Sequence, residues 1–285
     1  MPAQSLTSCA LAPTTIHLHP TAELAERVLL PGDPGRALLL AQSLLEAPKM
    51  FNHNRGLWGY TGTAADGAGL TIQSTGMGGP SAAIVISELS RLGAARLLRV
   101  GTCGALDRSL RLGEIVIATE SIAADGTSRA LGAGTRAAAS PDLLAALLAA
   151  ASSASEQPSS VAALASSEPL AASAGAEPSS LSVVSAGSEQ SALSAGSVRA
   201  GLVASTDLFY DAANGREQEW LSAGALAVEM ESATLFALAA RQGLDAGSLL
   251  VVSDIVLPSR TRIDPEALRS AEQRMGELAV RALAC

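Results

Sequence analysis

Short apolar runs alternate along this chain with longer segments whose apolar residues recur every three or four positions. The first pattern predicts buried strands, and the second predicts amphipathic helices. The expected strands are 27–30, 70–75, 96–100, 114–119, 198–205 and 248–253, with a further strand ending at Glu229. The expected helices are 34–45, 81–92, 232–241 and 265–283. Such alternation is typical of an α/β fold: a single domain with a mixed, largely parallel central β-sheet flanked by helices.

One long segment departs from this alternation. Residues 152–197 are almost entirely Ser, Ala, Gly, Glu and Pro, without an aromatic residue and without a period. A segment of this kind buries too little apolar surface to offset the entropy of ordering its backbone. We therefore predict one domain over residues 1–285, interrupted by a disordered, low-complexity insertion at 152–197.

The charge balance of the chain limits its partners. Its 27 acidic and 19 basic residues give a net charge of −8. Nucleic acid and anionic membranes repel such a chain, so we expect neither as a partner. No apolar run approaches the roughly 20 residues that span a bilayer, and no basic segment precedes an apolar core near the N-terminus. We expect a soluble, cytoplasmic protein.

Metal and cofactor sites are not indicated by the sequence. The three cysteines lie far apart, at Cys9, Cys103 and Cys285. The three histidines are His17, His19 and His53, and no second ligand stands at metal-binding spacing. We therefore expect neither a disulfide framework nor a metal site. The phosphate-loop, dinucleotide-binding, serine-hydrolase and zinc-protease motifs are also absent, so we expect no cofactor.

The segment LLPGDPGRA (29–37) joins an expected strand to an expected helix. Asp33 can cap this helix, and Pro34 suits its first position, where a backbone N–H is not needed. Free N–H groups beside Gly32, the helix dipole and the forked cation of Arg36 would then face one spot, which suits a small anion such as phosphate. A capped helix with a surface arginine is the alternative.

The segment RVGTCGA (99–105) repeats this combination of arginine and glycine. Arg99 ends an expected strand and precedes a Gly-Thr-Cys-Gly sequence that we expect to form a turn. Thr102 offers a hydroxyl and a backbone N–H, and the glycines allow a ligand to approach closely. An ordinary corner between strand and loop is the alternative.

Two further segments carry carboxylates. Glu231, in VEMES, stands where a strand should meet a helix and could accept hydrogen bonds from two neighbouring sugar hydroxyls, or only complement the helix dipole. Asp254, in VVSDI, stands at a strand end and could act as a general acid or have a structural role. Ligands gather at the carboxyl ends of parallel strands, so we expect these segments to line one pocket.

Taken together, the motifs resemble the nucleoside phosphorylase family, which includes the hexameric bacterial purine nucleoside phosphorylases and the uridine phosphorylases. The segments PGDPGRA, NRGLWGYTG, STGMGGPSAAIV, RVGTCGA, DLFY, VEMESA and VSD follow one another in the family order. The resemblance runs from about Ile16 to Leu283, outside the insertion. It implies phosphorolysis, in which a nucleoside and inorganic phosphate give a free base and (deoxy)ribose 1-phosphate.

The resemblance also implies roles for single residues. It assigns phosphate binding to Gly32, Arg36, Arg99, Val100, Gly101 and Thr102, completed by Arg55 from a neighbouring subunit of a homo-hexamer. It assigns nucleoside binding to Phe209, Val228, Glu229, Met230, Glu231, Ser253 and Asp254. A neighbour's His17 would reach the ribose 5′ hydroxyl, with His19 as the alternative. Glu231 would hold the ribose hydroxyls, and Asp254 would protonate purine N7.

Two differences from the uridine phosphorylases favour a purine substrate over uridine. Uridine phosphorylases typically carry Gln and Arg four and six residues after the DxFY phenylalanine, where this chain has Ala213 and Gly215. They also lack the Ser-Asp pair found here at the end of VVSD. We therefore expect a purine nucleoside phosphorylase. A uridine phosphorylase, a nucleosidase that uses water, and a non-catalytic nucleoside-binding protein are the alternatives.

Two features of the base site stay open in the sequence. Purine enzymes of the family often place an arginine on the helix after the aspartate to assist proton transfer, and Arg262 and Arg269 are the candidates here. Neither position distinguishes adenine nucleosides from 6-oxopurine nucleosides.

Overall fold

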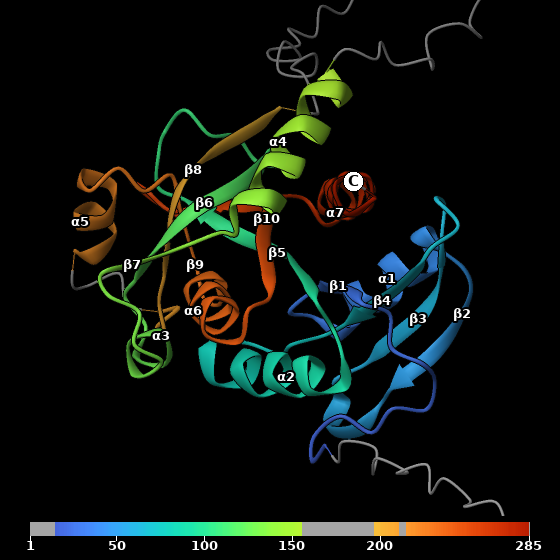
Figure 1. Ribbon diagram of the computed structural model, residues 1–285. Coiled ribbons are helices and arrows are strands. Elements are labelled where there is room, and N and C mark those ends of the chain that lie inside the picture. The colour runs from blue at the N-terminus through green and yellow to red at the C-terminus, as the bar shows by residue number, and fades with distance from the viewer. Residues whose placement is uncertain (1–14, 156–196, 211–214, 285) are drawn as a thin grey trace, which may run out of the picture.

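The computed structural model describes residues 15–155, 197–210 and 215–284. Its centre is a mixed β-sheet with helices packed on both faces (Figure 1). The strands are β1 (Arg27–Leu30), β2 (Leu45–Asn52), β3 (Gly59–Ala64), β4 (Gly69–Gln73), β5 (Arg96–Ala105), β6 (Ile115–Ala123), β7 (Arg136–Ala138), β8 (Val198–Ser205), β9 (Ala227–Glu229), β10 (Asp245–Ile255) and β11 (Thr261–Arg262). The helices are α1 (Pro34–Leu44), α2 (Gly79–Leu92), α3 (Gly126–Ala130), α4 (Pro141–Ser155), α5 (Arg216–Ser222), α6 (Ser232–Gln242) and α7 (Pro265–Leu283), with a short 3-10 turn, η1 (Asn54–Gly56).

The sheet combines a ring of strands with an open extension. Its strands run in the order β11-β10-β6-β8-β9-β5-β1-β4-β3-β2, and β7 adds to β6. Because β10 also pairs with β5, the strands β5, β9, β8, β6 and β10 close on themselves. Strand β1 pairs in parallel with β4 and β5, and β5 pairs in parallel with β10, whereas β3 is antiparallel to both β2 and β4. The predicted mixed α/β fold is confirmed.

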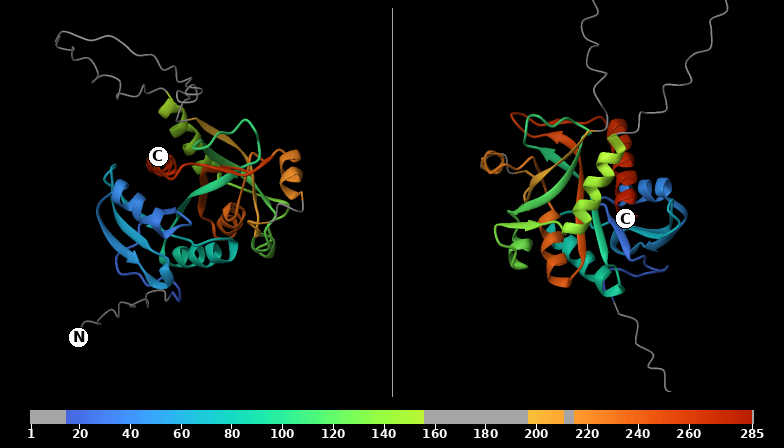
Figure 2. Two further views of the ribbon diagram at one scale, coloured as in Figure 1. Left: turned by 180° about the vertical axis from the view of Figure 1, so that it is seen from behind. Right: turned by 45° about the horizontal axis from the view of Figure 1, so that its top comes forward.

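The helices form two layers, one on each face of the sheet. On one face α7 contacts both α1 and α4, and on the other α2 packs against α6. Figure 2 shows α4 and α7 side by side, far from α2.

Alternating residues of the central strands supply the cores of these two layers. In β5, Leu97 belongs to the core that includes α2 and α6, whereas Leu98 belongs to the core that includes α1 and α7. In β10, Leu250 and Leu249 divide in the same way. Successive side chains of a strand point to opposite faces, so a strand covered on both faces is apolar at every position. The continuous apolar runs of the sequence follow from this double cover.

Most predicted elements are confirmed, with small shifts at their ends. Strands β1 and β8 and helix α7 have the predicted bounds. Helix α2 is closed at its C-terminus by Gly93, as predicted, and the left-handed φ of 107° at this position suits glycine. The turn predicted after Arg99 is wrong, because β5 continues to Ala105. Parallel pairing with β10 and antiparallel pairing with β9 hold this extension in the sheet.

The start of the predicted insertion also differs from expectation. Helix α4 continues to Ser155, so residues 152–155 are helical and their predicted disorder is wrong. The Leu and Ala residues that precede them are strong helix formers. The disorder predicted for 156–196 lies outside the described residues. Within the described ranges, no helix is both long and apolar enough to cross a membrane.

Candidate active site

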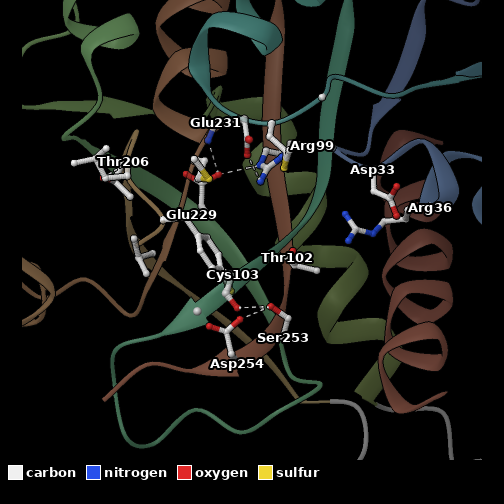
Figure 3. A pocket seen from close by; sticks show the side chains of 18 of the residues that line it. Asp33, Arg36, Arg99, Thr102, Cys103, Thr206, Glu229, Glu231, Ser253 and Asp254 are labelled. Carbon is white, nitrogen blue, oxygen red and sulfur yellow. Dashed lines mark hydrogen bonds and ion pairs between the residues drawn. The ribbon is translucent and has the colours of Figure 1, made fainter. Parts of the chain in front are cut away.

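A cavity of about 460 Å³ lies at the carboxyl ends of β1, β9 and β10, beside the N-termini of α1 and α6 (Figure 3). Most of the predicted site residues line it: Gly32, Arg36, Arg99, Thr102, Phe209, Val228, Glu229, Met230, Glu231, Ser253 and Asp254. The five segments that carry these residues, DLFY among them, lie far apart in the sequence. Their predicted convergence on one pocket is confirmed.

Arg36 reaches the cavity from the first turn of α1. Asp33 caps this helix by accepting a hydrogen bond from Gly35 N at 2.9 Å, and Pro34 takes the first helical position, as predicted. The Nε of Arg36 donates to Glu272 Oε1 on α7 at 2.6 Å, and both side chains are less than a tenth exposed. Figure 3 shows the guanidinium directed into the cavity, toward the side where Thr102 lies. The alternative of a surface arginine is therefore wrong.

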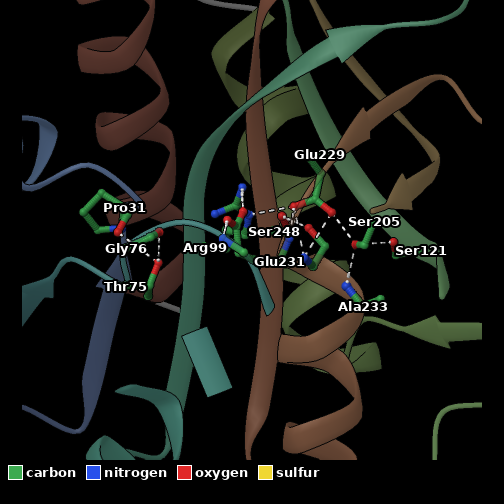
Figure 4. A network of polar contacts seen from close by, with 12 residues as sticks. Pro31, Thr75, Gly76, Arg99, Ser121, Ser205, Glu229, Glu231, Ala233 and Ser248 are labelled. Carbon is green, nitrogen blue, oxygen red and sulfur yellow. Dashed lines mark hydrogen bonds and ion pairs between the residues drawn. The ribbon is translucent and has the colours of Figure 1, made fainter. Parts of the chain in front are cut away.

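Arg99 lies between two buried carboxylates. Its Nε is 2.9 Å from Glu229 Oε2, and its Nη2 is 2.5 Å from Glu231 Oε2 (Figure 4). The three side chains are at most 7% exposed, so two negative charges and one positive charge are held together away from water. Gly101 makes room for this group, since a Cβ there would lie 2.7 Å from the Arg99 Cζ.

Two residues predicted to contact phosphate do not line the cavity. The side chain of Val100 is fully buried in the core that includes α1 and α7. Gly101 accommodates the Arg99 guanidinium, which explains the glycine without a ligand. The geometry therefore gives no support to a phosphate contact by either residue.

Glu229 uses its carboxylate to hold other parts of the site. It accepts hydrogen bonds from the Arg99 guanidinium, from the backbone N of Glu231 and Ser232 at 2.9–3.1 Å, and from the Ser205 hydroxyl. Figure 4 shows this network continuing from Ser205 to Ser121. Glu229 therefore positions Arg99 and the start of α6. Its predicted contact with the nucleoside stays a prediction.

Glu231 presents its carboxylate to the cavity. It stands at the N-cap position of α6 and makes no side-chain capping bond, and the alternative that it only complements the helix dipole stays open. Its oxygens accept from Arg99 and from the backbone N of Gly78. Burial raises the pKa of Glu231; nearby Arg99 opposes this effect, and Glu229 adds to it. A carboxylate held this way is a strong hydrogen-bond acceptor for sugar hydroxyls.

Asp254 lies near the end of β10, just after an irregularity in its pairing with β5. The Ser253 hydroxyl donates to Asp254 Oδ1 at 2.9 Å (Figure 3). Gly104 leaves space on the opposite strand, since a Cβ there would come 3.1 Å from Asp254 Oδ2 and 2.5 Å from Val256 Cγ2. The carboxyl group is buried, with Asp254 only 4% exposed.

The arginine that approaches Asp254 is Arg260, which the sequence analysis missed. Its Nη1 is 3.3 Å from Asp254 Oδ2, and its Cζ is 4.5 Å from the centre of the Phe209 ring. Of the two predicted candidates, Arg262 lies opposite Asp254 in the pairing of β10 with β11 but is exposed, and Arg269 lines a separate, smaller cavity beside Glu272. Arg260 lies between strands, where periodicity predicts no side-chain direction.

Cys103 also lines the cavity. Its thiol is buried, and burial raises its pKa far above the ordinary range, so it stays protonated and is a poor nucleophile. Among the described residues, no group of His, Cys, Asp and Glu side chains could hold a metal ion.

His17 and Arg55 lie outside this cavity. The Nδ1 of His17 is 2.8 Å from Glu88 Oε1, and Arg55 is exposed in η1. Asn54 joins them, since its Nδ2 donates to His17 O at 2.9 Å. Both residues therefore lie at one corner of the surface. His19 is also exposed there, with its Nε2 3.2 Å from the carbonyl oxygen of Ile16.

Comparison with known proteins identifies the family. The model of the phosphorylase superfamily matches residues 26–284. The chain belongs to this family. It is 34% identical to a DeoD-type purine nucleoside phosphorylase of Alkaliphilus metalliredigens, over 82% of this chain and 84% of that protein. It is 33% identical to a guanosine phosphorylase of Halorubrum lacusprofundi, over 81% and 78%.

A solved structure of the phosphorylase superfamily supports the fold. The uridine phosphorylase of Vibrio fischeri ES114, complexed with 6-hydroxy-1-naphthoic acid, superposes with a TM-score of 0.70. The match covers 91% of each chain at 24% identity.

Proposed function

We propose that this chain is a purine nucleoside phosphorylase, a pentosyltransferase that moves a (deoxy)ribosyl group from a purine base to inorganic phosphate. The observation that carries the proposal is one cavity that joins two buried arginines, Arg36 and Arg99, with two buried carboxyl groups, Glu231 and Asp254. DeoD-type relatives at 34% identity over more than four fifths of the chain support it. Phosphate is a co-substrate, and the reaction needs no cofactor.

The arginine side of the cavity holds phosphate. Arg36 and Arg99 provide forked donors that match phosphate oxygens, and the Thr102 hydroxyl adds a neutral donor. A phosphate oxygen forms the new bond to C1′ of the sugar while the bond from C1′ to the base breaks. Positive charge develops on the sugar during this step, and the phosphate dianion stabilises it. Glu231 accepts hydrogen bonds from the ribose hydroxyls and orients the sugar.

The carboxyl side of the cavity handles the leaving base. The electron pair of the broken bond moves onto the base, and Asp254 donates its proton to purine N7, so the base leaves neutral. Asp254 then regains a proton from solvent. The aromatic ring of Phe209 and the side chains of Val228 and Met230 supply the apolar wall of the base and sugar site.

A substrate panel tests this activity against its alternatives. We expect phosphate-dependent release of base from purine nucleosides, with uridine at least 100-fold slower. Faster cleavage of uridine would indicate a uridine phosphorylase, base release without phosphate would indicate a nucleosidase, and binding without turnover would indicate a binding protein.

We also propose that the protein is a cytoplasmic homo-hexamer built from dimers, in which His17 and Arg55 complete a neighbouring cavity. Both lie at an exposed corner, and neither lines the cavity of its own chain. The bond between Glu88 and Nδ1 leaves Nε2 of His17 to face a partner.

Mixing two inactive variants tests this shared site. Arg55→Ala and Asp254→Asn should each be nearly inactive alone. In a symmetric dimer that exchanges these residues, co-refolded variants should regain about a quarter of wild-type activity, because half of the dimers are mixed and one of their two sites is intact. Sedimentation gives the size of the assembly. No recovery from a demonstrably mixed assembly would contradict the shared site.

A second variant tests how Arg36 is held. Glu272→Ala removes the carboxylate that fixes the Arg36 Nε, so the KM for phosphate should rise about tenfold, the usual effect of one charge-assisted hydrogen bond. Glu272→Gln keeps an oxygen that can accept from Arg36, so it should raise the KM for phosphate less. The KM for nucleoside should stay the same, and Glu277→Gln, on the exposed side of α7, is the control. Equal changes in both KM values would show a general structural effect instead.

A further inference from the structure

Arg260 lies beside Asp254, the group proposed to protonate purine N7. Its guanidinium packs on Phe209, with Cζ 4.5 Å from the ring centre, and reaches Asp254 Oδ2 with Nη1 at 3.3 Å. Phe209, Asp254 and Arg260 all line the cavity. The aromatic ring and the carboxylate together hold the guanidinium beside the group that would protonate N7. The side chain of Arg260 is 34% exposed, which places it at the mouth of the cavity.

A guanidinium in this position recognises only acceptors. Arginine has five N–H donors and no acceptor. Arg260 contacts Asp254 through Nη1, so the N–H groups of Nη2 and Nε can face a ligand. Next to N7, a 6-oxopurine carries a carbonyl oxygen, whereas adenine carries an amino group. Since Asp254 is the proposed donor to N7, the guanidinium bonds O6 of a 6-oxopurine, whereas on adenine it meets a second donor.

The neighbouring carboxyl group does not offset this mismatch. An adenine amino group would need an acceptor, and Asp254 is the nearest carboxyl group. Its Oδ1 already accepts from the Ser253 hydroxyl at 2.9 Å, and its Oδ2 faces Arg260. A 6-amino group at Oδ2 would compete with the guanidinium for the same oxygen. A 6-oxo group leaves both contacts in place and adds a bond to Arg260.

We propose that Arg260 is the specificity residue of the base site and makes 6-oxopurine nucleosides, such as inosine and guanosine, the preferred substrates over adenosine. This inference rests on the proposed phosphorolysis of purine nucleosides. One hydrogen bond from a charged donor changes binding by about ten- to hundredfold, which sets the expected size of the preference.

The test compares substrates in wild type and in Arg260→Met, which keeps the apolar packing on Phe209 and removes every donor. We expect wild type to show a kcat/KM for inosine at least tenfold above that for adenosine. In the variant this ratio should fall close to one, because kcat/KM should fall for inosine and stay the same for adenosine. The control is Arg91→Met, in the exposed last turn of α2, which should keep the wild-type ratio.

Two results would overturn the inference. One is a wild-type enzyme without a preference for inosine. The other is an Arg260→Met variant in which both substrates lose activity equally, since that would show that Arg260 acts only on Asp254.

Calorimetry with free bases separates this inference from the proposed activity. Hypoxanthine should bind wild type at least tenfold more tightly than adenine, and Arg260→Met should remove the difference. If no nucleoside is cleaved but this pattern holds, the proposed function is wrong and the base selection by Arg260 stands. If purine nucleosides are cleaved and the two bases bind equally, the base selection is wrong and the proposed function stands.

Discussion

Replacing Arg99 by methionine should abolish phosphorolysis and lower the free energy of unfolding by about 3–5 kcal/mol, because it leaves two buried carboxylates without a cation. Glu229 and Glu231 are both almost fully buried against this guanidinium. Breaking a buried ion pair from one side is among the most destabilising of single changes. Denaturant unfolding at pH 7 measures the effect.

The pH dependence of this variant identifies the cause. Burial already raises the pKa of Glu231 in the wild-type protein, and Arg99 opposes that rise. Without Arg99 the pKa of Glu231 should rise further above its value in the unfolded chain. The folded variant then binds a proton more readily than the unfolded one, so its stability should be greatest at acid pH and should fall as pH rises through the folded pKa.

A double variant provides the matched control. Adding Glu231→Gln to Arg99→Met removes one of the two uncompensated charges, so it should restore part of the stability at pH 7 and none of the activity. If the stability of Arg99→Met did not vary with pH, or if the double variant were the less stable of the two, the buried carboxylates would not be the source of the loss.

Replacing Asp254 by asparagine should lower kcat for purine nucleosides by about 10²- to 10⁴-fold, the usual contribution of a general acid. Asparagine keeps the shape of the side chain and an oxygen that can accept from Ser253, so the fold should persist. Steady-state phosphorolysis of inosine measures the change, and thermal unfolding checks the fold.

A substrate that needs no proton separates general acid catalysis from other effects. A purine nucleoside methylated at N7 already carries a positive base, which leaves neutral without a proton from Asp254. Asp254→Asn should therefore cleave this substrate nearly as fast as wild type. An equal loss with inosine and with the methylated nucleoside would show that Asp254 positions the substrate and does not donate a proton.

Local features of the chain were predicted well because neighbouring residues decide them. The cap by Asp33, the proline at the first position of α1 and the glycine at the end of α2 need only the backbone around them. The central strands were found because both of their faces are covered and their runs are continuously apolar. Strand β2 was missed, since most of its middle residues are exposed and give no alternating pattern.

The partners of the site residues could not be predicted in this way. Arg36 bonds a carboxylate 236 positions away, and Arg99 bonds one 130 positions away. Spacing along the sequence gives no information about such pairs. The predicted turn after Arg99 failed for the same reason, because pairing with the distant β10 keeps those residues extended.

By itself, the sequence determined the α/β class, the motifs in their family order and the four segments that carry the candidate chemistry, because apolar periodicity and caps are local properties. Only the tertiary structure decided which partner each side chain of these segments contacts. It enclosed Arg99 between Glu229 and Glu231, set Glu272 behind Arg36, and brought Arg260 to Asp254 in place of Arg262 or Arg269. These contacts arise where the sheet brings distant strand ends together, and a buried charge there needs a partner wherever in the chain it comes from.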